Sequence, residues 1–116
     1  MQLEEQLFNT LGPLVAGNVF PDTAPPGTPP PYILYQQVGG RPVQFLEGIG
    51  SSVMPRMQIT IWSESRLQAA ELQRAAQRLL VAGPLFGLIA GGAVALYDPA
   101  VGYRGSRQDF HFSGDP

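Results

Sequence analysis

A proline-rich segment between Pro21 and Pro31 is the feature that most restricts the fold of this chain. Six of its eleven residues are proline. Each proline fixes φ near about −65° and lacks an amide donor, which rules out a helix or a central strand. Such a run adopts an extended, polyproline-like backbone. We therefore expect a stiff, extended connector between two packed elements.

The segment before the connector has the pattern of a short amphipathic helix. Leu3, Leu7 and Leu11 recur at helical spacing, which predicts a helix over residues 3–14. Gly12-Pro13 disrupts its last turn, since proline disfavours helical backbone at the preceding residue. Val19-Phe20 then predicts a brief strand.

Two strands are expected after the connector. Tyr32–Val38 is rich in aromatic and β-branched residues, and we expect it to end at Gly39-Gly40. Arg41–Ser52 contains glycine and serine at many positions and is expected to be an irregular loop. Met54–Trp62 alternates and is the clearest strand of the chain. Trp62 falls on the more polar face, which indicates that an arm or another subunit partly covers that face.

A long helix is predicted from Ser65 to about Ala82. Ser65 and Gln68 have the spacing of a capping box, and Gly83-Pro84 has the order typical of a helix end. The expected core stripe is Ala69, Leu72, Ala76, Leu79 and Leu80. The expected solvent face is Gln68, Glu71, Arg74, Gln77 and Arg78.

The final third of the chain predicts two more strands, Ala93–Tyr97 and Ser106–Phe112, joined by a turn-rich loop. The order helix, strands, helix, strand pair indicates an α+β fold. We expect a mostly antiparallel sheet with one long and one short helix on one face, plus extended Pro/Gly-rich loops. A chain of 116 residues fits one domain, residues 1–116.

The composition indicates an assembling protein. Charged residues make up only 14% of the chain, so much of its surface is uncharged, and large apolar patches mark contact surfaces. All the basic residues other than His111 are arginine, and they are scattered along the chain without forming a basic run. This pattern argues against a nucleic-acid partner. No cysteine is present, no apolar run reaches membrane-spanning length, and the acidic amino terminus does not resemble a signal peptide. We expect a soluble protein made in a reducing cytoplasm and no membrane partner.

A catalytic or metal site is not predicted. His111 alternates with Asp109 and Ser113, but neighbours on one face of a strand lie roughly 7 Å apart, beyond direct hydrogen-bond reach. No second cluster supplies further metal ligands. We expect no catalytic residues, no metal and no cofactor. A small hydrolase or metal enzyme that uses His111 stays open as an alternative.

Several segments taken together resemble a known family. They are Val19-Phe20-Pro21-Asp22, Pro29-Pro30-Pro31-Tyr32 leading into Tyr35-Gln36, Arg56–Trp62 with the alanine-rich helix behind it, Tyr97-Asp98-Pro99, and Ser106–Phe110. Their order and spacing are similar to the bacteriophage tail-completion, or tail-terminator, family of head–tail joining proteins.

The resemblance implies a structural virion protein that caps the head-proximal end of the tail tube. Such proteins form a ring, usually a hexamer, end tube polymerisation, and join the tube to a head-side connector, adaptor or head-completion protein. The residues expected at interfaces are Tyr35, Arg41, Gln44, Phe45, Leu46, Glu47, Ile49 and Trp62. Another neck component, or a cellular interaction module with a Pro-rich docking segment, remains an alternative.

Overall fold

The computed structural model describes the backbone of residues 2–45 and 48–113, and the side chains of residues 2–39 and 55–113. The elements in chain order are α1 (Leu3–Leu11), the 3₁₀ turn η1 (Gly12–Leu14), β1 (Val19–Pro21), β2 (Tyr32–Phe45), β3 (Gly48–Ser63), α2 (Arg66–Val81), β4 (Leu88–Ile89), β5 (Val94–Asp98) and β6 (Tyr103–His111).

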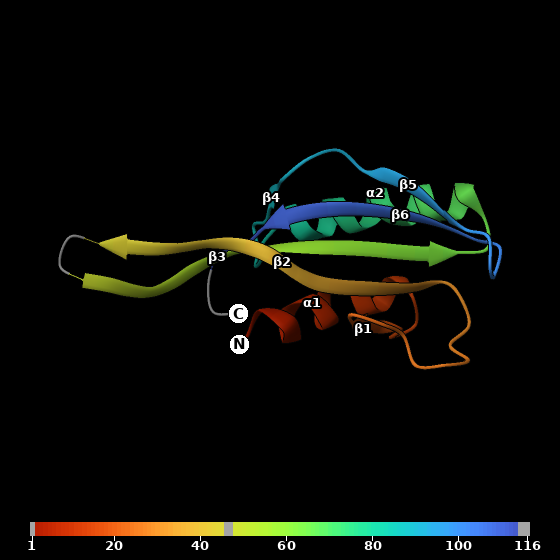
Figure 1. Ribbon diagram of the computed structural model, residues 1–116, viewed down its shortest axis with the longest axis horizontal. Coiled ribbons are helices and arrows are strands. Elements are labelled where there is room, and N and C mark those ends of the chain that lie inside the picture. Colours follow the sequence, from red (N-terminus) through yellow and green to blue (C-terminus); the bar gives the residue numbers. More distant parts are fainter. Residues whose placement is uncertain (1, 46–47, 114–116) are drawn as a thin grey trace.

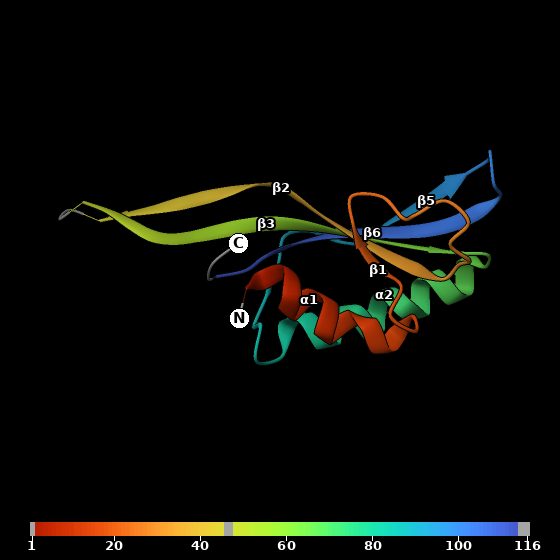
Figure 2. The same ribbon diagram turned by 90° about the horizontal axis from the view of Figure 1, so that it is seen from below.

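Within the described residues, six strands form one sheet in the order β1-β2-β3-β6, and β4 and β5 both pair with β6. The pairing of β1 with β2 is parallel, whereas the pairings of β2 with β3 and of β6 with β3, β4 and β5 are antiparallel. Both helices lie on one face of the sheet (Figure 2). The expected α+β fold, with a mostly antiparallel sheet, is confirmed.

The proline-rich connector follows from the parallel pairing of β1 and β2. Val19 lies opposite Ile33 and Pro21 opposite Tyr35, so the chain must return to the end at which β1 began. Residues 22–31 make this return without helix or strand, and a turn closes where the Thr28 amide donates to the Pro25 carbonyl at 3.2 Å. The connector runs beside the β1 edge of the sheet (Figure 1) and rises on the side opposite the helices (Figure 2).

The core lies between this sheet and the two helices. Ile33, Ile59 and Ile61 project from the middle strands and are completely buried, as is Phe110 on β6. The leucines at positions 3, 7 and 11 of α1 are buried as their spacing predicted. Burial of each such side chain stabilises the fold by about 1.5–3 kcal/mol.

The long helix is confirmed, but part of its predicted core stripe is wrong. Ser65 is its N-cap and accepts a hydrogen bond from the Gln68 amide at 3.2 Å, whereas the Gln68 side chain pairs with the Ser63 hydroxyl. Leu79 is 40% exposed, although we expected it in the core. Gln73 is buried in its place, because Ala69, Gln73, Ala76 and Leu80 follow one face of the helix.

The molecule is elongated, with principal extents of 52 × 25 × 24 Å. The long axis arises because the paired ends of β2 and β3 project beyond the rest of the sheet (Figure 1). We call the sheet with its two helices the body, and residues 40–45 and 48–54 the arm. Neither helix of the described chain is both long and apolar enough to cross a lipid bilayer.

Candidate assembly surfaces

The arm is the most unusual feature of the fold. Within it, Arg41 lies opposite Met54, Gln44 opposite Ile49, and Phe45 opposite Gly48. On its other side, β3 begins to pair with β6 only at Arg56, opposite His111. The arm is therefore a two-stranded ribbon with no third strand in the described part of the chain (Figure 1).

Our prediction that β2 ends at Gly39-Gly40 and that Arg41–Ser52 is an irregular loop is wrong. β2 continues to Phe45, and β3 begins at Gly48. The glycine pair falls within a register shift between Gln37 and Gly40, and a second shift follows Pro42. Glycine and proline weaken a strand locally, but here the ladder resumes after each irregularity.

The residues expected at interfaces fall into three groups. Arg41, Gln44, Phe45 and Ile49 come together on the arm, where only their backbone is described. Leu46 and Glu47 lie outside the described residues. Tyr35 and Trp62 belong to the body and lie apart from the arm, with Trp62 next to the last residue of β3.

Trp62 lies on the face of the sheet opposite the helices, as the alternation of β3 predicted. It pairs with Tyr32 on β2 and with Gly105 on β6. A Cβ atom at Gly105 would lie 2.8 Å from the Trp62 ring, so glycine is needed for the indole to cover the strand. Trp62 itself is half-buried.

Tyr32 and Tyr103 extend this aromatic surface. Their rings meet edge to face, with centroids 6.5 Å apart. Burial raises the pKa of the Tyr32 phenol, and the neighbouring Tyr103 and Asp98 raise it further. We call the half-buried Tyr32, Trp62 and Tyr103 the aromatic face. It is an apolar surface that the helices do not cover, next to the proline-rich connector.

Tyr35 has a different environment from the one expected for an interface residue. Its side chain is only 8% exposed and belongs to the core cluster. Burial raises the pKa of the phenol, and the Glu4 carboxylate, which accepts its hydrogen bond, and Asp22 raise it further. Since the chain itself buries Tyr35, we assign it to the core and leave it out of the surfaces proposed below.

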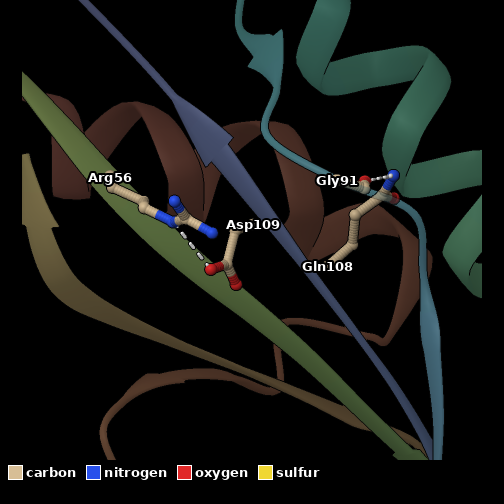
Figure 3. Close-up of polar contacts among 4 residues, drawn as sticks. All are labelled: Arg56, Gly91, Gln108 and Asp109. Atoms are coloured by element: carbon tan, nitrogen blue, oxygen red, sulfur yellow. Dashed lines mark hydrogen bonds and ion pairs between the residues drawn. The ribbon is translucent and has the colours of Figure 1, made fainter.

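A buried glutamine network links α2 to β6, and the sequence analysis did not find it. Gln73 donates to the Gln108 side-chain carbonyl at 3.1 Å, and Gln108 donates to the Gln77 side-chain oxygen at 3.0 Å. Gln108 also donates to the Gly91 carbonyl at 3.0 Å (Figure 3). The side-chain oxygen of Gln73 is buried without a partner in the described structure. The helical period that includes Ala69 and Ala76 was the available signal, since Gln73 falls on the same stripe.

The Asp109-His111-Ser113 pattern does not form a triad within the described structure. Figure 3 shows that Asp109 points away from Gln108 and toward Arg56 on the neighbouring strand. The Asp109 carboxylate accepts a hydrogen bond from the Arg56 guanidinium at 2.8 Å. The structure gives Asp109 no contact with His111. No group of three or more potential metal ligands was found among the described residues.

Comparisons with known proteins agree with an assembly role. The model of a family described as tail completion protein gp17 matches residues 7–113. Among solved structures, a chain of the "virion of native gene transfer agent (GTA) particle" superimposes with a TM-score of 0.67 at 18% sequence identity. The match covers 94% of this chain and 89% of that chain, and it shows a shared fold. No curated protein matches the sequence.

Proposed function

The chain belongs to the tail completion protein gp17 family and is thus a structural component of a phage-like virion, and we propose that it caps the head-proximal end of the tail tube as a ring. In this role it ends tube polymerisation and presents a surface to a head-side connector, adaptor or head-completion protein. The expected copy number is six. The protein acts by binding and not by catalysis.

The observation that carries this proposal is the arm. An isolated two-stranded ribbon is at best marginally stable in water, and the arm has no helix or third strand behind it in the described structure. A segment of this kind gains stability when another protein packs against it. Because the arm projects from the body, we expect a neighbouring subunit or the tube to contact it.

A ring adds a second requirement. In a closed ring the contacts are head-to-tail, so each subunit needs two different binding surfaces. The arm and the aromatic face are distinct surfaces at different places in the molecule. We propose that the arm contacts the adjacent subunit or the tube, and that Trp62 contributes to a subunit contact.

Deletion of Gln44–Gly50 tests the arm. The body should still fold, because its core lies elsewhere, whereas tails should no longer be completed and joined to heads. Electron microscopy of particles, together with co-sedimentation of the purified chain with tail tubes, measures this. Glu64→Gln is a suitable control, because Glu64 is exposed and outside the arm.

Two outcomes would count against this proposal in different ways. Normal head–tail joining by the deletion variant would show that the arm is not the contact. Binding of the wild-type chain to head connectors but not to tubes would favour another neck component.

Substitution of Trp62 by alanine tests the aromatic face. We expect a loss of assembly larger than the loss of thermal stability, because the indole is half-buried and alternates with the buried Ile61, so it lies on the face opposite the core. Sedimentation velocity and thermal unfolding of the same preparation give both quantities. If the melting temperature falls sharply while assembly of the folded fraction is normal, Trp62 serves the fold alone.

A further inference from the structure

An apolar groove runs between α2 and β5, at one edge of the sheet. Its volume is about 310 Å³, and its lining includes Ala69 and Ala70 of the helix, Ala95 of β5, and Gly105 of β6. A cavity of about 150 Å³ is sufficient to hold a benzene molecule, so the groove has room for a phenyl ring. Small side chains alone do not define a binding site, but the charges around the groove narrow the choice of partner.

Two arginines border the groove on the helix side. Arg66 and Arg74 line it together with the alanines, and both are exposed. Among the described residues the Arg56–Asp109 contact is the one ion pair, so neither of these guanidiniums forms an ion pair within the described part of the chain. A partner for the groove should therefore combine an apolar side chain with carboxylates.

The opposite edge of the same chain presents that combination. Phe8 on α1 is 46% exposed, and Glu4 and Glu5 stand in the turn before it, at the first turn of the helix. Residues four apart lie on the same side of a helix, so Glu4 shares a side with Phe8. The Glu4–Tyr35 hydrogen bond places that side toward β2, away from α2.

The two surfaces are complementary in charge, and they lie at opposite edges of the molecule. The strand order puts β1 at one edge and β4 and β5 at the other, with α1 near the former and α2 near the latter (Figure 1). A surface on one edge that fits a surface on the other joins copies head-to-tail, which is the contact a ring requires.

We propose that Phe8 of one copy inserts into the groove between α2 and β5 of the next copy, with Glu4 and Glu5 facing Arg66 and Arg74. The partner is a second copy of this chain. This proposal rests on the proposed ring and identifies the contact that closes it. It is separate from the arm, which is free to contact the tube.

Cross-linking tests the geometry directly, because the chain has no cysteine. In a Glu5→Cys/Arg74→Cys variant, a short bis-maleimide should join the two positions between copies and give a ladder of oligomers that ends at the ring. Each single-cysteine variant should stop at dimers. The matched control is Glu5→Cys/Val101→Cys, since Val101 is 56% exposed and does not line the groove. A ladder no stronger than that of the control overturns the proposal.

Energetic tests use the apolar contact. Phe8→Ala removes the ring, and Ala70→Trp fills the groove. Each variant should raise the dissociation constant for self-association, measured by sedimentation velocity, by roughly tenfold or more. If both variants assemble like wild type, the groove is not the contact. If the Phe8→Ala and Ala70→Trp variants form no rings, but the variant that lacks Gln44–Gly50 still completes tails, the contact between Phe8 and the groove is supported and the arm hypothesis is wrong. A chain that stays monomeric alone and on tubes overturns both.

Discussion

The two halves of the β2–β3 hairpin differ in what surrounds them. In the body, β3 pairs with β2 on one side and β6 on the other, and Ile59 and Ile61 are completely buried above the helices. In the arm, the same two strands pair only with each other among the described residues. We therefore expect the body to supply the stability of the chain, and we propose the arm as a binding element.

The largest effect is expected from Phe110→Ala, which tests whether the body carries the stability. Phe110 is fully buried, and its ring stacks near Phe112 with centroids 6.1 Å apart. Loss of the ring leaves a cavity and should lower the free energy of unfolding by about 3–5 kcal/mol. Chemical denaturation measures this.

Phe8→Ala is the matched control for that variant, because it removes the same ring from a position that is 46% exposed. The free energy of unfolding should change by about 0.5 kcal/mol or less. Equal losses at the two positions would contradict the assignment of stability to the core, and they would also undermine Phe8 as a docking residue.

An intermediate effect is expected from Tyr35→Phe, which tests a polar contact of the core. The variant loses the hydrogen bond to Glu4 and should be less stable by about 0.5–1.5 kcal/mol at neutral pH. Folding raises the pKa of Tyr35. The contribution of Tyr35 to stability is therefore fully present below its pKa in the unfolded chain, about 10, and is lost as the pH rises through its higher pKa in the folded chain.

The alkaline loss of stability above about pH 10 should therefore be smaller in Tyr35→Phe than in the wild type. The pKa of Tyr32 is raised as well, so the variant should still lose some stability at alkaline pH through Tyr32. Denaturation midpoints between neutral and alkaline pH measure the difference. If stability falls with rising pH to the same extent in both proteins, Tyr35 does not contribute to the alkaline loss of stability.

The smallest effect on stability is expected from the deletion of Gln44–Gly50, which tests whether the arm contributes to the stability of the body. Arg56 and His111 form the β3–β6 pair nearest the arm, and the deleted segment lies beyond this pair. The deletion therefore removes no residue of the described core. We expect a change of about 0.5 kcal/mol or less in the free energy of unfolding, measured by denaturation. A loss as large as that of Phe110→Ala would show that the arm is part of the folding unit.

Periodicity predicted most elements of the body. The buried sides of α1 and β3 were predicted from residue spacing alone, since Leu3, Leu7 and Leu11 repeat with the helical period and Met57, Ile59 and Ile61 alternate. Leu79 was assigned to the wrong side of α2, and the buried Gln73 was left out of the predicted core stripe. Hydrophobicity favoured the leucine, but Gln108 accepts a hydrogen bond from the buried Gln73 side-chain nitrogen, and composition does not reveal such a partner.

The candidate surfaces were harder to predict. Arg41, Gln44, Phe45 and Ile49 were grouped from an expected loop, and the structure places them on a paired ribbon. The glycines and proline of this segment mask its strand character, because pairing between two distant strands outweighs the weak local preference of each residue. The groove between α2 and β5 had no signal along the chain, since its walls come from residues 66–74 and 93–106.

The sequence by itself determined the fold class, the proline-rich connector and the sides of α1 and β3 that face the core. These follow from local constraints, namely fixed proline dihedrals and the periods of helix and strand. Tertiary structure alone decided the partner of Gln73, the extension of β2 and β3 into an arm, and the placing of Phe8 and the alanine groove at opposite edges. These features depend on which distant segments meet, and that is set by the packing of the whole chain.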